Sequence, residues 1–307
     1  MNPQSVFVDP LLTNVYLGYK NAELVADIFA PKVPVNKESG IFFKNDKSNL
    51  IVPGSTKRGL TGSANRVSGK LNTDTYTLEE HSLEEWIDDR ILKTYDNPFD
   101  PRRNATNRIA GQLLIEKENE LITNLAAATT GSNKVDAAGN WATAGTDLRA
   151  QVKTGNNLIH KATGVRANTL VLDRLSYDAL VGTNTDFKAS IAYTMDKTEA
   201  NLRNLIAGYF DVQQVLIAGG IKQSAAESGT GSFLWSTKGL AYLAYVNPTP
   251  AIEEPSALYQ FYKEDMVGVD VRREEGHKSD VVRATDFYVM KVVDSDCLYK
   301  FLDTVTD

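Results

Sequence analysis

Residues 100–130 read DPRRNATNRIAGQLLIEKENELITNLAAATT, and this stretch predicts one long α-helix over residues 101–129. Asp100 can cap the first amide groups with its carboxylate, and Pro101 suits the first helical position because its nitrogen carries no hydrogen to leave unbonded. Gly131 is the residue type that commonly follows the end of a helix. At the usual rise the helix is about 40 Å long, well beyond the average of about three turns, so other elements must lie along it.

Apolar side chains form two neighbouring stripes on this helix at 100° per residue. The broader stripe contains Ala110, Leu113, Leu114, Leu121, Leu125 and Ala128, the second contains Ile115, Ile122 and Ala126, and Glu116 and Glu120 hold the remaining face. We therefore expect a spine helix that is covered on two sides.

The composition is that of a folded protein with one large core or two smaller ones. The chain has 307 residues, of which 42% are hydrophobic and 23% are charged. No apolar run approaches the roughly 18 residues of a membrane span, so no membrane partner is expected. The N-terminal sequence predicts no secretory signal, and the single Cys297 allows no internal disulfide and fits a reducing cytoplasm.

Charge is unevenly distributed along the chain. The net charge of -6 argues against broad binding to a phosphate backbone, which needs an excess of Lys and Arg. Within residues 41–70, however, six bases face one acid, Asp46. The bases are Lys44, Lys47, Lys57, Arg58, Arg66 and Lys70, and the acids that follow before the next base are Asp74, Glu79, Glu80, Glu84, Glu85, Asp88 and Asp89.

The first 83 residues predict an extended structure with little core of its own. Prolines punctuate residues 1–36, which indicates an arm with one helix at 21–29. In residues 41–83, two strand-like flanks surround a Gly- and Ser-rich middle, which predicts a long hairpin. At about 3.3 Å per residue it could reach some 60 Å, and a lone two-stranded hairpin is marginal in water. Such an arm implies a partner surface.

The remaining chain alternates helices and strands. Helices are predicted at 86–95, 146–163 with Thr146 or Asp147 as cap, 174–181 and 199–209; strands at 168–172, 212–218, 232–235, 240–246, 258–261 and 267–272. Residues 131–145 predict a turn or hairpin that carries Trp141. The last two strands, VVRATDFYVMKVV and DCLYKFLDTV, are expected to return to the layer of the spine helix, because the ends of an inserted domain usually lie close together.

No pattern of catalytic or metal-binding residues emerges. His81, His160 and His277 lack the spacing of metal ligands, and the residues around Gly69 and Lys70 do not complete a phosphate-binding loop. No nucleophile elbow or dinucleotide fingerprint is present, and Cys297 is expected to be a packed thiol. We expect no catalytic residue, no cofactor and no metal, so the chain is predicted not to be an enzyme.

Three stretches carry a family resemblance. Residues 146–187, TDLRAQVKTGNNLIHKATGVRANTLVLDRLSYDALVGTNTDF, predict a helix, a strand and a helix. Residues 202–220, LRNLIAGYFDVQQVLIAGG, and 232–246, SFLWSTKGLAYLAYV, predict a helix, a strand and a hairpin. Together with the order of arm, hairpin, spine helix and α/β block, they resemble the major capsid proteins of tailed bacteriophages, whose fold is named after the Hong Kong ninety-seven phage.

The resemblance implies an α+β fold with four regions. They are an N-terminal arm at 1–40, an extended β-hairpin loop at 41–83, a peripheral domain at 84–164 and 276–307 with the spine helix at 101–129, and a mixed α/β axial domain at 165–275. The axial domain would cluster around the symmetry axes of capsomers.

The resemblance also implies a structural function. The chain would assemble with itself into hexamers and pentamers of an icosahedral head shell, enclosing double-stranded DNA without sequence-specific binding. It would be made and assembled in the host cytoplasm and reside in the virion. A scaffolding protein, a portal and a decoration protein are further partners that the family allows, and the absence of a coiled-coil segment before the arm favours a separate scaffold. Lys57 lies near the loop tip, but no Asn partner or catalytic Glu matches the isopeptide cross-link of some relatives.

Two other interpretations stay open. An encapsulin-type compartment shares the fold and holds an enzyme instead of a genome; the long loop and the chain length favour the phage interpretation over it. A soluble cytoplasmic α/β enzyme explains the block 165–275 but leaves the arm and the loop without a purpose.

The charge reversal suggests how subunits meet. If the loop lies across an adjacent subunit, as in the family, its cations need an acidic surface, and the spine residues Glu116 and Glu120 would add to it. The predicted intersubunit contacts are Lys57, Arg58, Arg66 and Lys70 on the loop, and Glu79, Glu80, Glu84 and Glu85 after it.

Overall fold

The computed structural model describes residues 8–21, 24–44, 47–50, 56–58, 60, 62–67, 69–70, 72–94, 100–129, 131–137, 140–143, 146–192, 196–223, 233–235, 238–250 and 254–305.

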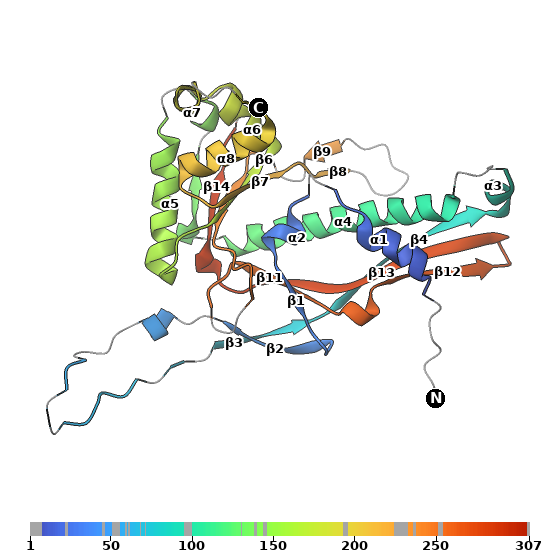
Figure 1. Cartoon of the computed structure of the whole chain (residues 1–307), viewed down its shortest axis with the longest axis horizontal. Helices are drawn as coiled ribbons and strands as arrows, with labels where there is room; N and C mark the ends of the chain where they lie inside the picture. The colour runs from blue at the N-terminus through green and yellow to red at the C-terminus, as the bar shows by residue number, and fades with distance from the viewer. Residues whose placement is uncertain are drawn as a thin grey trace.

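Two five-stranded sheets organise the described chain (Figure 1). The first contains β1 (Lys32–Pro34), β11 (Leu258–Tyr262), β13 (Ser279–Val292) and β12 (Gly268–Glu274) in that order, and β4 (Glu79–Asp88) also pairs with β13. The second has the order β5 (Lys134–Asp136), β14 (Leu298–Leu302), β10 (Ala241–Ala244), β6 (Thr169–Asp173) and β7 (Gln214–Ala218).

The spine helix is α4 (Pro101–Ala128), which lies along the first sheet. Asp100 caps it as predicted, and its Oδ1 accepts hydrogen bonds from the amides of Arg102 at 3.0 Å and Arg103 at 3.4 Å. The helix ends at the C-cap Thr129, whose hydroxyl donates to the Leu125 carbonyl, so Gly131 lies two residues beyond the cap.

The spine helix is covered on two sides, and the broader predicted stripe is confirmed at Ala110, Leu113, Leu121 and Leu125, which are all buried. Toward the sheet, Ile109 and Leu113 pack with Val282 and Ala284, and helix α1 (Pro10–Gly18) adds Leu12 to the same cluster. The expected second stripe is wrong in part, because Ile115 and Ile122 are only half-buried and Ala126 is exposed. Two charged residues, Lys117 and Glu118, are buried instead.

The N-terminal region contains more helix than expected. Helix α1 is missing from the prediction, although Asp9 and Pro10 repeat the start of the spine helix: Asp9 Oδ1 accepts from the Leu11 amide at 2.9 Å. The prolines of this region predict an extended chain, whereas Pro10 stands at the first position of α1. The predicted helix at 21–29 is reduced to α2 (Ala26–Phe29), and β1 follows it.

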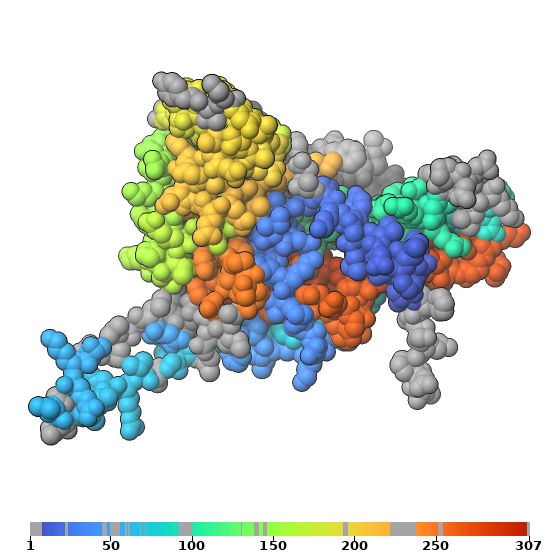
Figure 2. Space-filling model, viewed as in Figure 1, coloured from blue at the N-terminus to red at the C-terminus, as the bar shows by residue number. Residues whose placement is uncertain are grey.

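The predicted hairpin is regular only at its base. Strands β2 (Ser39–Lys44) and β3 (Asn72–Thr77) pair antiparallel over their full length, and a short 3-10 helix, Lys47–Leu50, follows β2. Figures 1 and 2 show the loop projecting from one end of the body.

The strand after the hairpin is longer than expected. The predicted division at residue 83 falls inside β4, which pairs with β13 from Glu79 to Asp88. The predicted helix at 86–95 is therefore wrong in its first turn, since α3 spans Asp89–Thr94. Pairing with the long strand β13 keeps β4 extended up to Asp88, although the sequence from residue 86 has the pattern of an amphipathic helix.

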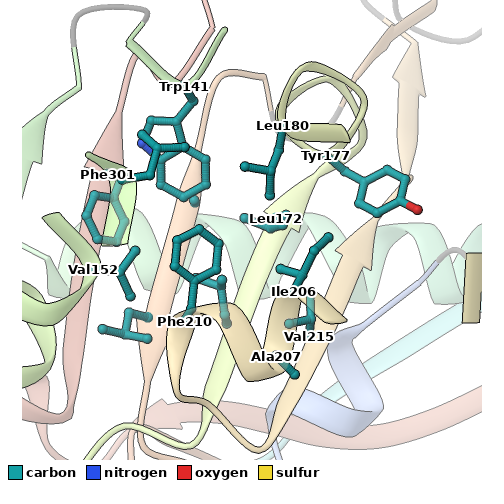
Figure 3. Close-up of a cluster of buried hydrophobic side chains, with 14 of the residues drawn as sticks. Trp141, Val152, Leu172, Tyr177, Leu180, Ile206, Ala207, Phe210, Val215 and Phe301 are labelled. Carbon is teal, nitrogen blue, oxygen red and sulfur yellow. The ribbon is translucent and has the colours of Figure 1, made fainter. Parts of the chain in front are cut away.

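Helices cover one face of the second sheet. They are α5 (Leu148–Thr163), α6 (Arg174–Gly182), α7 (Thr185–Ser190) and α8 (Glu199–Phe210); α7 was not predicted. Asp147 caps α5 by accepting from the Ala150 amide, and Gly164 ends it with φ +79°. Figure 3 shows Trp141 and Phe210 packed against sheet residues such as Leu172 and Phe301. A separate hairpin consists of β8 (Ile221–Gln223) and β9 (Phe233–Trp235).

The strands of the C-terminal half are divided between the two sheets. The final two strands were expected to return together to the spine helix; β13 does so, but β14 pairs with β10 and β5 in the second sheet. Strands β11 and β12 join the first sheet through β13, although the predicted axial block runs to residue 275. The alternation of elements along the chain does not specify which strands pair.

Candidate assembly surfaces

The four predicted loop cations, Lys57, Arg58, Arg66 and Lys70, are all exposed on the projecting loop. Local hydrogen bonds shape this segment: Arg58 Nε donates to the Gly62 carbonyl at 2.6 Å. The Lys70 amide donates to Asn49 Oδ1 at 2.9 Å, and Asn49 Nδ2 returns a bond to the Lys70 carbonyl at 3.1 Å. Leu60, at 104% relative exposure, adds an apolar side chain to the loop. The loop therefore offers cations and an apolar group to whatever covers it.

The four predicted acids lie on β4 but do not form one surface. Successive strand residues point to opposite faces of a sheet, so each Glu–Glu pair is divided. Glu85 faces the spine helix, where its Oε2 accepts from Arg108 Nε at 3.1 Å. Glu84 faces the other side, where Arg272 of β12 donates to it at 2.9 Å. By the same alternation, Glu79 shares the face of Glu85, and Glu80 shares that of Glu84.

Several of the acids that follow the loop are already used within the subunit. Besides Glu84 and Glu85, Asp74 pairs with Lys44 at 2.5 Å, and Asp89 pairs with Arg273. The Lys44 ammonium lowers the pKa of Asp74. Each such exposed pair contributes about 0–1 kcal/mol.

The two spine acids differ in exposure. Glu116 is exposed, whereas Glu120 turns inward and accepts a hydrogen bond from the Met290 amide at 3.3 Å. Burial raises the pKa of Glu120. Of the predicted acidic groups, Glu79, Glu80, Glu84, Asp88 and Glu116 are exposed on the subunit, and Glu84 is already bound by Arg272.

The sequence prediction missed a buried charged cluster beneath the N-terminal segment. Lys117 Nζ lies 2.5 Å from Asp27 Oδ1 and 5.0 Å from the centre of the Tyr288 ring. Glu118 accepts two backbone hydrogen bonds from the same segment, at Val25 and Ala26. A local indication was present, since positions 117 and 118 lie one turn from Leu113, Leu114 and Leu121 and so interrupt the apolar stripe.

Two of the three histidines and the cysteine make packing contacts, whereas His160 is exposed. His81 stacks on Tyr288 with ring centres 4.2 Å apart, and His277 stacks on Trp86 at 5.0 Å. Cys297 is fully buried. Across the described part of the chain, no group of three or more His, Cys, Asp or Glu residues is placed to hold a metal ion. In the same residues, none of the helices has the length and apolar character that a membrane span requires.

The sequence has a full-length relative among phage proteins. It is 28% identical over 305 residues to the major capsid protein of Burkholderia phage BcepMu, covering 95% of each chain. It is also 25% identical over 111 residues to the major capsid protein of Pseudomonas phage JBD67, covering 36% of each chain. No family model matches the sequence.

Solved structures share the architecture. A phage-related protein from Bordetella bronchiseptica superposes with a TM-score of 0.76 at 20% identity, covering 99% of this chain and 100% of that one. The structure from Microbacterium phage Oxtober96 gives a TM-score of 0.60 at 11% identity, with 98% and 95% covered. The chain has the fold of the tailed-phage major capsid proteins. The fold class predicted from the sequence is therefore confirmed.

The phage capsid fold also occurs in an encapsulin. The holo-SrpI encapsulin complex from Synechococcus elongatus gives a TM-score of 0.54 at 12% identity, covering 100% of this chain and 92% of that one. The fold alone therefore does not separate the two kinds of shell, whereas the full-length sequence match is to a phage protein.

Proposed function

We propose that this chain is a major capsid protein, a structural protein whose copies assemble into the head shell of a phage. The observation that carries this conclusion is the match over 95% of both chains to the BcepMu major capsid protein, joined to the capsid fold. The protein acts as a building unit of the virion, not as an enzyme.

The shape of the subunit supports self-assembly. The loop between β2 and β3 projects from the body and is paired regularly over six residues of each strand at its base. A two-stranded ribbon is only marginally stable by itself in water. The surface of a second copy would therefore keep the projecting loop ordered. Many weak contacts repeated in a closed symmetric assembly then add up to a stable shell.

The same proposal extends to the form of the shell and its contents. The subunits form hexamers and pentamers, and the shell encloses double-stranded DNA without reading its sequence. The net charge of -6 supports enclosure without extensive phosphate contacts. Assembly takes place in the host cytoplasm with a separate scaffolding protein, and a portal and a decoration protein complete the head.

For the intersubunit contact, we propose that the loop of one copy lies on the acidic groups of the next. The proposed partners of Lys57, Arg58, Arg66 and Lys70 are the exposed carboxylates of Glu79, Glu80 and Glu116, which lie on opposite faces of β4 and on the spine helix and therefore are separate contact points. The exposure of these groups and their opposite charge support the contact. Because Glu84 and Glu85 already bind arginines of their own subunit, they would contribute less.

Electron microscopy of the purified chain, with and without coexpressed phage assembly proteins, tests the function. Closed shells that protect DNA from nuclease are expected. Shells that contain a folded enzyme and no DNA would favour the encapsulin alternative, which the structural match to the Synechococcus elongatus complex keeps open. A monomer at every protein concentration, salt concentration and scaffold condition would contradict both.

A further inference from the structure

The N-terminal segment 24–35 crosses the spine helix at Glu118. The Glu118 Oε2 atom accepts hydrogen bonds from the amides of Val25 and Ala26 at 3.0 Å and 2.9 Å. These amides begin the short helix α2, whose own N-cap, Val25, makes no side-chain capping bond. A carboxyl group from another element thus satisfies two backbone donors that would otherwise be buried without a partner.

The other carboxyl oxygen of Glu118 is poorly accommodated. Glu118 is 1% exposed, and among the described residues its Oε1 has no hydrogen-bond partner. Burial disfavours the ionised form, and this outweighs the two backbone donors, so the pKa of Glu118 rises to about 7. The protonated group keeps its carbonyl oxygen available to the same two amides.

Other charged groups surround the segment. Asp27 of α2 repels the Glu118 carboxylate and raises its pKa further. Asp27 is itself paired with Lys117 and with Lys32 of β1, at 2.5 Å and 3.3 Å. Despite desolvation, these two cations lower the pKa of Asp27 below its ordinary value, so it stays ionised at neutral pH.

The groups on the sheet side act on different residues. Asp286 of β13 lies toward Lys117, whose pKa is lowered chiefly by burial. Glu120 faces His81 of β4 and the Met290 amide. Neither group contributes to the surroundings that raise the Glu118 pKa.

We propose that Glu118 is a pH-sensitive latch for the N-terminal segment 24–35, closed in mildly acidic solution and loosened in alkaline solution. A carboxyl group whose pKa is raised on folding stabilises the folded state below its unfolded pKa, near 4.5, and loses that contribution as the pH rises through about 7. Asp27 has the opposite sign: its contribution is lost only when the pH falls below its ordinary range. The segment is therefore held most tightly in mildly acidic solution, above the range in which Asp27 is protonated and below a pH of about 7.

Other contacts also hold the segment, so loss of the Glu118 contact should cause only local opening. Phe29 and Ala30 are fully buried, and β1 pairs with β11 over only three residues. Loosening the latch should raise the frequency at which the segment opens without unfolding the body. The latch belongs to a single chain, so its test does not depend on shell formation.

Hydrogen exchange of the full chain at pH 6 and pH 8.5, corrected for intrinsic exchange rates, tests the latch. The informative amides are those of Phe29 and Ala30, which donate to the Val25 and Ala26 carbonyls. We expect about tenfold stronger protection at pH 6 than at pH 8.5. The amides of β10, Ala241–Ala244, should show no such difference.

Two variants of the spine helix sharpen the test. Glu118→Gln keeps an acceptor oxygen but cannot ionise, so its protection should be equal at the two pH values. Glu116→Gln removes an exposed carboxyl group of the same helix and should keep the wild-type difference. Equal protection in the wild type, or an unchanged difference in Glu118→Gln, would overturn the proposal. If Glu118→Gln fails to fold, the wild-type comparison of segment 24–35 with β10 still decides.

Discussion

Individual positions on the spine helix illustrate how tertiary contacts decide whether an apolar residue is buried. Leu121 and Ala126 belong to the two apolar stripes that the sequence predicts, yet their surroundings differ. Leu121 is 1% exposed and packs in the cluster that contains Phe29 and Leu298, whereas Ala126 is exposed. A charge should therefore be tolerated at one position and not at the other.

Leu121→Asp should abolish soluble, folded protein. An unpaired carboxylate in this cluster costs several kcal/mol or becomes protonated, and the lost leucine packing adds a further 2–5 kcal/mol. The matched control Ala126→Asp should lose no more than about 1 kcal/mol, since only helix propensity changes. Thermal unfolding of the unassembled subunit measures both. A soluble Leu121→Asp variant that melts like the wild type would mean that α4 is not buried at this point.

At the scale of elements, close packing of α5 on the second sheet depends on a glycine inside the helix. The carbon of a methyl group at Gly155 would lie 2.8 Å from Cδ1 of Tyr299 on β14, which is closer than a Cβ atom normally lies to a non-bonded atom. Gly208 of α8, in contrast, has no atom of the described residues within 4 Å of the place where such a group would stand, apart from its chain neighbours and the backbone of its own helix. Substituting alanine for each of these two helical glycines therefore distinguishes the effect of helix propensity on stability from the effect of packing.

Gly155→Ala should destabilise the subunit by about 1–3 kcal/mol, because overpacking outweighs the gain in helix propensity. Gly208→Ala should stabilise it by about 0.5–1 kcal/mol, because only the propensity term remains. Denaturant unfolding of both variants under one set of conditions measures the difference. If both substitutions stabilise the protein, α5 can shift away from β14 and the contact at Tyr299 is not close-packed.

At the scale of the whole molecule, the subunit consists of a packed body and one projecting loop (Figure 2). The body supplies its own cores around the two sheets, while the exposed cations of the loop are proposed to meet carboxylates of another copy. Folding and assembly should therefore be separable by substitutions in the loop.

Reversing all four loop cations, Lys57, Arg58, Arg66 and Lys70, to Glu should leave the subunit folded and prevent shell formation. Each exposed pair is worth about 0–1 kcal/mol, but every copy repeats it. Circular dichroism should be unchanged while light scattering by assemblies disappears. Normal shells from this variant would rule out the electrostatic contact, and loss of the folded signal would place the loop in the subunit's own core.

A charge-conserving control exchanges Lys and Arg at the same four positions and should still assemble. Glu79→Lys, Glu80→Lys and Glu116→Lys, introduced together into the reversed variant, should restore part of the assembly if these carboxylates are the partners. Wild-type assembly should also weaken with added salt, since the Debye length is near 8 Å at physiological ionic strength and shortens as salt rises. Failure of the three lysines to restore any assembly would place the loop on another surface.

The sequence by itself determined the elements whose ends and faces depend on nearby residues. Asp100 and Pro101 mark the start of α4, Asp147 caps the start of α5, and the predicted strand at 168–172 corresponds to the buried strand β6. Caps and periodicity are interactions within a few residues, so they can be read from the chain directly. The order of such elements carried the family resemblance, and the resemblance implied the capsid fold class.

Only the tertiary structure decided which distant segments meet. Strand β4 runs on to Asp88 because β13 pairs with it, and β14 joins the second sheet because β10 offers it an edge. Glu118 is buried by residues more than ninety positions earlier in the chain, at Val25 and Ala26. Strand pairing and the burial of charge depend on contacts between segments far apart in sequence, and no local pattern contains that information.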